Sequence, residues 1–151
     1  MLYDLLKTLH ILCAVAAVGS NLTYSAWFLR GAREPEHFGF ALRGVRFIDD
    51  WLSNPAYAGL GVSGACLVVA GGLPWGLAWV WGGMSLLVLT SILGLGVYGP
   101  LLRRQIRALD DEGPDSPRFR SLSLQGACLG GLFGVLNLLT FGLMVFKPEK
   151  F

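Results

Sequence analysis

Residues 77–102 read LAWVWGGMSLLVLTSILGLGVYGPLL, a stretch without Asp, Glu, Lys or Arg. About 20 consecutive apolar residues are enough for a helix to cross the roughly 30 Å hydrocarbon core of a bilayer. Three further apolar runs of that length lie at 5–29, 52–73 and 122–146. Because the four runs take up most of the chain, the sequence predicts one all-α domain, residues 1–151. Its predicted form is an up-and-down bundle of four transmembrane helices.

The composition supports this interpretation. Only 15% of the residues are charged, against about 25% in a typical globular domain. No acidic residue lies inside an apolar run, since Asp49 and Asp50 come just before the second one. The chain is therefore predicted to be a polytopic membrane protein in contact with lipid, without a relay of carboxylates through the membrane.

The basic residues predict an orientation. Nine of the twelve Lys and Arg residues lie in segments 30–51 and 103–121. The positive-inside rule places such segments in the cytoplasm, so both termini are expected outside. The formal net charge of +2 then reflects topology, and no nucleic-acid partner is predicted.

The first of these segments also has a helical pattern. Between residues 36 and 50, apolar side chains recur at helical spacing, with the arginines away from that stripe. A short interfacial helix, with its apolar side among the lipid headgroups, fits this pattern. The alternative is a plain connector with accidental periodicity. The apolar positions are Phe38, Ala41, Leu42, Val45 and Ile48.

His10 is the only histidine inside the apolar runs. An ionisable side chain in hydrocarbon is costly and is by default a candidate functional residue. At about 100° per residue, its helical face carries small or polar side chains. We therefore expect this face to point into the bundle, with Asn21 forming a hydrogen bond to another helix. The residues that share the face are Cys13, Ala17, Asn21, Tyr24 and Phe28.

The predicted orientation puts His10 at the same depth as several sulfur-containing residues, in the outer half of the membrane. The donors could ligate one haem b, with His10 as axial ligand and Met84 or Met144 as the second. Lys7 would then lie near a haem propionate. The set His10, Cys13, Met84 and Met144 also suits Cu(I). A third possibility is a neutral His10 that binds no cofactor and forms a hydrogen bond across the bundle.

The last apolar run carries Gly126, Gly130 and Gly134, a small residue at every fourth position. Such spacing allows helix backbones to approach closely in lipid. It predicts a packing seam, either within the bundle or with a partner in a homo-oligomer or membrane complex. In that complex the chain would be a non-catalytic structural or accessory subunit.

Several short motifs carry a family resemblance. They are LKTLHIL at 6–12, VGSN at 18–21, Asp50-Trp51 and MVFKP at 144–148. With these motifs the chain resembles, over nearly its whole length, the bacterial predicted integral membrane proteins of domain of unknown function 2269. The resemblance implies a location in the bacterial inner membrane and brings no established activity.

The chain is more distantly similar to copper-resistance D-type proteins and to membrane protoporphyrinogen oxidases. The latter hold haem b between a first-helix histidine and a third-helix lysine. His10 matches the first role, whereas the third run here has no lysine and offers Met84 instead. No P-loop, HExxH or GxSxG pattern assigns a reaction. The leading hypothesis from the sequence is a protein that binds one b-type haem for redox or haem handling. Copper binding or transfer and an accessory subunit are the alternatives.

Overall fold

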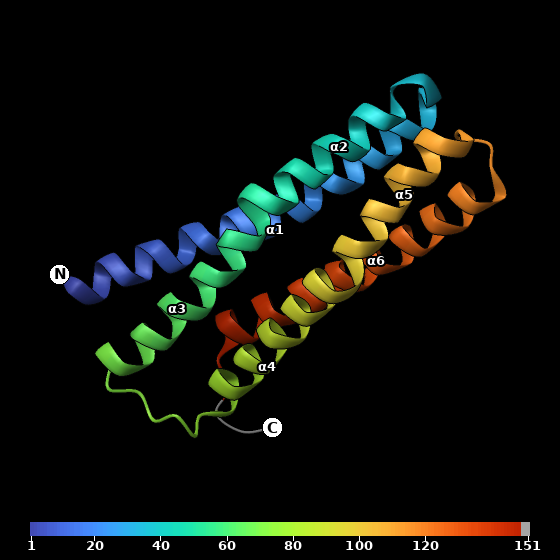
Figure 1. The fold of residues 1–151 in the computed structure, drawn as a ribbon. Helices are drawn as coiled ribbons and strands as arrows, with labels where there is room; N and C mark the ends of the chain where they lie inside the picture. The colour runs from blue at the N-terminus through green and yellow to red at the C-terminus, as the bar shows by residue number, and fades with distance from the viewer. Residues whose placement is uncertain (149–151) are drawn as a thin grey trace.

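The computed structural model describes residues 1–148, which are almost entirely helical and contain no strand (Figure 1). The elements in chain order are α1 (Leu2–Arg33), the 3₁₀ turn η1 (Pro35–His37), α2 (Phe38–Ile48), the π-helix η2 (Asp49–Ser53), α3 (Asn54–Ala70), α4 (Ala78–Leu93), the π-helix η3 (Gly94–Tyr98), α5 (Gly99–Glu112) and α6 (Pro117–Phe146).

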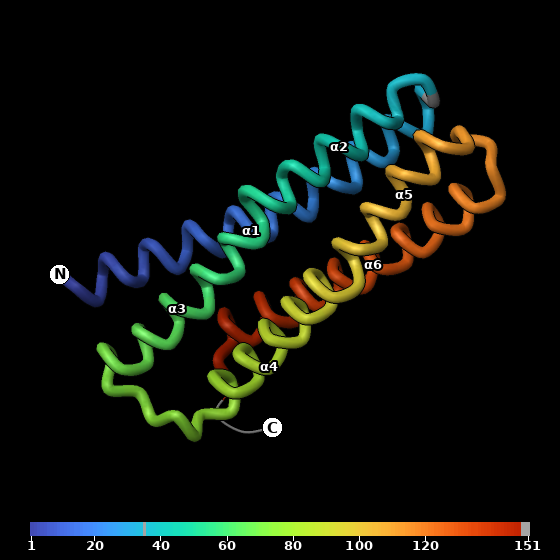
Figure 2. The backbone as a smooth tube through the Cα atoms, viewed as in Figure 1, coloured from blue at the N-terminus to red at the C-terminus, as the bar shows by residue number. Residues whose placement is uncertain are grey.

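The two π-helical segments continue the helices on either side of them. Figure 2 shows the backbone passing from α2 through η2 into α3, and from α4 through η3 into α5, without interruption. The described residues therefore form four long helices, each apolar and long enough to cross a membrane. The prediction of a four-helix membrane bundle is confirmed.

The long helices extend past the predicted apolar runs. Their lengths of 30 to 35 residues correspond to about 45–53 Å at a rise of about 1.5 Å per residue, more than the hydrocarbon core requires. Most of the predicted loop 103–121 is accordingly helical, because α5 continues to Glu112. The turn that follows contains Gly113 at a φ of 83°. Ser116 then caps α6, accepting a hydrogen bond from the Phe119 N–H at 3.1 Å.

The helices form two hairpins, α1 with α2–α3 and α4–α5 with α6. We call the end that holds the start of α1, the end of α6 and the α3–α4 connection the terminal end, and the opposite end the basic end (Figure 1). Segments 30–51 and 103–121 reach the basic end, where α2 of one hairpin packs against α5 of the other. Arg43 of α2 also binds Asp110 of α5, with Nη1 and Oδ1 3.2 Å apart.

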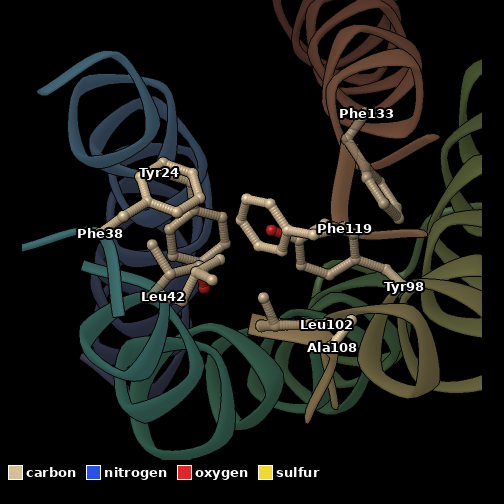
Figure 3. Close-up of a cluster of buried hydrophobic side chains, with 9 residues drawn as sticks. Tyr24, Phe38, Leu42, Tyr98, Leu102, Ala108, Phe119 and Phe133 are labelled. Atoms are coloured by element: carbon tan, nitrogen blue, oxygen red, sulfur yellow. The ribbon is translucent and has the colours of Figure 1, made fainter. Parts of the chain in front are cut away.

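The helix predicted between residues 36 and 50 is present as α2, but its apolar side lies elsewhere than expected. Phe38, Ala41, Leu42 and Val45 are buried within the protein rather than among lipid headgroups. The reason is that α2 runs straight on into η2, which keeps it alongside α1 and α5. Figure 3 shows the resulting cluster, in which the Phe38 and Phe119 rings meet edge to face with centroids 5.4 Å apart.

Prolines explain why the two long helices contain π-helical segments. Pro55 follows η2 by two residues, and Pro100 follows η3 by two residues. A proline inside a helix cannot donate its backbone hydrogen bond, and its ring clashes with the carbonyl four residues earlier. A wider π turn just before the proline relieves this conflict while the helix continues.

Two hexapeptides, GLGVSG at 59–64 and GLGVYG at 94–99, have the glycine spacing of dinucleotide-binding loops. That motif requires a turn between a strand and a helix, so that backbone N–H groups can reach a phosphate. Both hexapeptides lie within continuous helices instead. They therefore do not indicate a nucleotide site; the glycines of the first hexapeptide meet side chains of neighbouring helices instead.

Leu42 tests the importance of the cluster at the basic end, because its side chain is fully buried there. We expect Leu42→Ala to lower the free energy of unfolding by about 2–5 kcal/mol through the cavity that it leaves. Leu29→Ala is the matched control, since Leu29 is 66% exposed, and should cost less than about 0.5 kcal/mol. Reversible unfolding in mixed micelles measures both variants, and equal losses would contradict the role given to the cluster.

Candidate functional site

A cavity of about 230 Å³ lies inside the bundle, bordered by both π-helical segments. Residues from all four long helices contribute to it, and most of the lining side chains are polar. A polar cavity within membrane-spanning helices marks a candidate ligand site. The lining residues are Asn21, Asp49, Ser53, Asn54, Tyr57, Ala58, Thr90, Ser91, Gly94, Leu95, Tyr98 and Phe133.

Asp49 supplies a carboxylate to this cavity. Its Oδ1 accepts a hydrogen bond from the Tyr24 hydroxyl at 3.2 Å, and its Oδ2 accepts one from Asn54 Nδ2 at 3.4 Å. A carboxylate can accept about four hydrogen bonds, so both oxygens keep acceptor capacity. No Lys, Arg or His is among the described residues that line this cavity. Among the same residues, Asp49 supplies the one carboxyl group of the cavity lining.

A polar bridge crosses three helices at one side of the cavity. Asn21 Nδ2 donates hydrogen bonds to the Ala17 carbonyl at 2.8 Å and to the Tyr57 hydroxyl at 3.0 Å. The Tyr57 hydroxyl in turn donates to Asn137 Oδ1 at 2.9 Å. Asn21 thus forms the predicted hydrogen bond between helices. The bridge uses the donor hydrogens of both Asn21 and Tyr57, and it leaves Asn21 Oδ1 as an acceptor.

Two hydroxyl groups of α4 also donate hydrogen bonds to backbone carbonyls. Thr90 Oγ1 donates to the Leu86 carbonyl at 2.7 Å, and Ser91 Oγ donates to the Leu87 carbonyl at 2.8 Å. Each oxygen can still accept a hydrogen bond through its lone pairs. Thr90 and Ser91 therefore present acceptor oxygens to the cavity that holds the Asp49 carboxylate. That arrangement favours a ligand that is positively charged or rich in hydrogen-bond donors.

His10 lies outside this cavity, on the seam between α1 and α3. Its Nδ1 is 2.9 Å from Ser63 Oγ, and that hydroxyl also bonds to the Gly59 carbonyl. Since a hydroxyl has one proton, donation to Gly59 leaves Ser63 as the acceptor of an Nδ1–H. This hydrogen bond assigns a proton to Nδ1, and Nε2 is not part of it. This geometry matches the hydrogen-bonded, cofactor-free alternative for His10.

Glycines of α3 provide the space for the α1 side chains. A Cβ on Gly64 would lie 3.2 Å from His10 Cε1, and one on Gly59 would lie 2.7 Å from Cys13 Sγ. Both α1 side chains therefore pack directly on the α3 backbone. The seam brings His10 and Cys13 to the same neighbouring helix.

The remaining predicted ligands lie elsewhere in the structure. The Met144 methyl group of α6 sits over Gly83 of α4, next to Met84. Lys7 is exposed to the surroundings of the helix. Met144 thus lies on the seam between α4 and α6, whereas His10 and Cys13 lie on the seam between α1 and α3.

The geometry gives no support for a haem or metal centre. Among residues 1–148, no group of three or more His, Cys, Asp and Glu side chains is placed to hold a metal ion. His10 lines neither the Asp49 cavity nor a second cavity of the described residues, where α1 turns into α2. The donor chemistry of an unprotonated Nε2 fits a haem iron, but the space that a porphyrin needs beside His10 is not part of either cavity.

The three glycines of α6 have different surroundings. Gly126 is buried, and a Cβ there would lie 3.7 Å from Gln105 Oε1 of α5. A Cβ on Gly130 or Gly134 would meet no atom of the described chain within 4 Å. One glycine therefore serves packing within the bundle, whereas the other two leave an open face of α6.

Residues 4–148 match the model of the family described as predicted integral membrane protein (DUF2269). No curated protein and no solved structure that we compared matches the chain. Because the match covers nearly the whole sequence, this four-helix membrane protein belongs to the DUF2269 family of predicted integral membrane proteins.

Proposed function

We propose that the protein binds a small monovalent cation, such as ammonium or a primary amine, in the cavity around Asp49. One observation carries this proposal: three lining side chains have committed their donor hydrogens to protein acceptors, while their oxygens and the Asp49 carboxylate stay open to a donor. Asn21, Thr90 and Ser91 all show this pattern. An ammonium group supplies both the charge and the donor hydrogens that such a cavity lacks.

The size of the cavity agrees with such a ligand. Its volume of about 230 Å³ exceeds the roughly 30 Å³ that one water occupies in the liquid. A small amine, or ammonium with several waters, therefore fits. The Tyr57 and Tyr98 side chains that line the cavity could add cation–π attraction to a bound cation. Binding inside the bundle would suit a protein that senses or moves this cation.

Asp49→Asn tests the proposal, because it removes the charge while keeping the shape of the side chain. We expect the affinity for methylammonium to fall by about 10- to 100-fold, the equivalent of one charge-assisted hydrogen bond of about 1.5–3 kcal/mol. Calorimetric titration of the purified full chain with methylammonium chloride measures the effect.

Asp50→Asn is the matched control for this experiment. Asp50 is the next residue but does not line the cavity, and it pairs with Arg46 at 3.4 Å. Its replacement should leave methylammonium binding unchanged. The proposal is wrong if both variants bind alike, or if the unmodified chain binds neither ammonium nor methylammonium.

A second candidate function rests on the orientation of the His10 ring alone, because neither cavity lies beside that ring. The hydrogen bond from Nδ1–H to Ser63 would orient the ring and leave Nε2 as a ligand, as second-shell acceptors do for metal-bound histidines. His10 would hold the iron of one b-type haem, which supplies one-electron redox chemistry when bound. Cu(I) bound by His10 with Cys13 is the corresponding copper alternative.

The absorption spectrum of protein purified from haem-replete cells tests this second function. A Soret band that His10→Ala abolishes and His37→Ala retains would support an axial ligand. His37 is the matched control because it is the chain's other histidine, in η1. A colourless protein that also takes up no copper after anaerobic Cu(I) loading would exclude both metal functions, without bearing on Asp49.

The orientation and the partners remain part of the proposal. The basic residues support a bacterial inner-membrane protein with segments 30–51 and 103–121 in the cytoplasm and both termini outside. The open face at Gly130 and Gly134 would suit a close helix contact in a homo-oligomer or a membrane complex.

A further inference from the structure

A second cavity, of about 180 Å³, lies at the basic end, where α1 turns into α2. It shares no lining residue with the Asp49 cavity. The apolar run of α1 ends just before this point, so the second cavity lies at the boundary between hydrocarbon and headgroups. We call it the headgroup pocket. Its lining residues are Trp27, Arg30, Gly31, Glu34, His37, Phe40 and Ala41.

Three ionisable side chains of the headgroup pocket lie close together without forming hydrogen bonds. Arg30 Nη2 is 3.7 Å from Glu34 Oε1, and His37 Nδ1 is 3.8 Å from Glu34 Oε2. Both distances exceed the range of about 2.7–3.2 Å for an N–H···O hydrogen bond. The guanidinium and the carboxylate therefore keep donor and acceptor capacity for a ligand placed between or beside them.

Two aromatic side chains form the apolar wall of the headgroup pocket. The Trp27 and Phe40 rings meet edge to face, with centroids 6.1 Å apart. Phe40 is 70% exposed in the isolated chain, which fits a side chain that lipid surrounds. Tryptophan is enriched at the level of the lipid headgroups, because its ring is apolar while its N–H is polar. The pocket thus combines a cationic group, an anionic group and an apolar wall at headgroup depth.

We propose that the headgroup pocket binds the headgroup of phosphatidylethanolamine. The lipid phosphate accepts hydrogen bonds from the Arg30 guanidinium and from His37 when it is protonated. The lipid ammonium group donates to the Glu34 carboxylate. The aromatic wall packs against the glycerol and the first acyl carbons. This inference is independent of the function proposed for the Asp49 cavity.

The charges distinguish this lipid from other common ones. Phosphatidylglycerol also carries a phosphate, but it presents no cation to Glu34, so a carboxylate beside it is unfavourable. The trimethylammonium group of phosphatidylcholine has a positive charge but no N–H to donate to Glu34. Phosphatidylethanolamine alone among these three matches both the Arg30 and the Glu34 side of the pocket.

Native mass spectrometry of the purified full chain with equal amounts of the three lipids, each with palmitoyl and oleoyl chains, tests the proposal. We expect at least fivefold more bound phosphatidylethanolamine than either other lipid. Arg30→Gln should lower this binding at least fivefold. Glu34→Gln should remove the preference for phosphatidylethanolamine over phosphatidylglycerol while retaining phosphate binding.

Two neighbouring residues provide matched controls. Arg33 and Glu36 are exposed in the same segment but do not line the headgroup pocket. Arg33→Gln and Glu36→Gln should leave the lipid preference unchanged. The proposal fails if the unmodified chain binds the three lipids equally, or if the control variants lose as much binding as Arg30→Gln and Glu34→Gln.

Discussion

The lack of water in the bilayer interior is the constraint on which this structure depends. Backbone groups there must form hydrogen bonds within the chain, so the membrane segments are helices. Pro55 and Pro100 interrupt this pattern inside two continuous helices, and each is preceded by a π-helical segment. Because η2 and η3 both border the same cavity, the two irregular turns and the polar site occur at one place in the fold.

The same constraint separates the two polar sites of the bundle. A polar group without a partner is costly in a medium that excludes water. His10 meets this requirement through its hydrogen bond with Ser63. Asp49 receives two neutral donors, Tyr24 and Asn54, but no cationic side chain lines its cavity. The Asp49 carboxyl group therefore keeps acceptor capacity, which is the basis of the proposed cation binding.

The sequence predicted the spanning helices well, because length and apolar composition alone determine them, and it placed Asn21 correctly on an inward face. It did not identify the Asp49 cavity. Asp49 precedes the second apolar run, and a boundary drawn by hydropathy assigned it to a loop, although the helix runs unbroken from Phe38 to Ala70. Pro55 and Pro100 were the sequence feature that could have indicated the cavity, because each follows a π-helical segment that borders it. Seam contacts such as His10 with Ser63 depend on helix rotation, which periodicity fixes too coarsely to predict.

Side-chain packing at the basic end helps to explain how the bundle can hold a polar cavity elsewhere. Between helices in lipid there is no hydrophobic driving force, since lipid tails are as apolar as leucine. The buried cluster of Leu42, Val45, Leu102 and Phe119 instead joins α2, α5 and α6 through close packing of side chains. This packing at the basic end holds the hairpins together, so the residues around η2 and η3 do not need to pack as tightly.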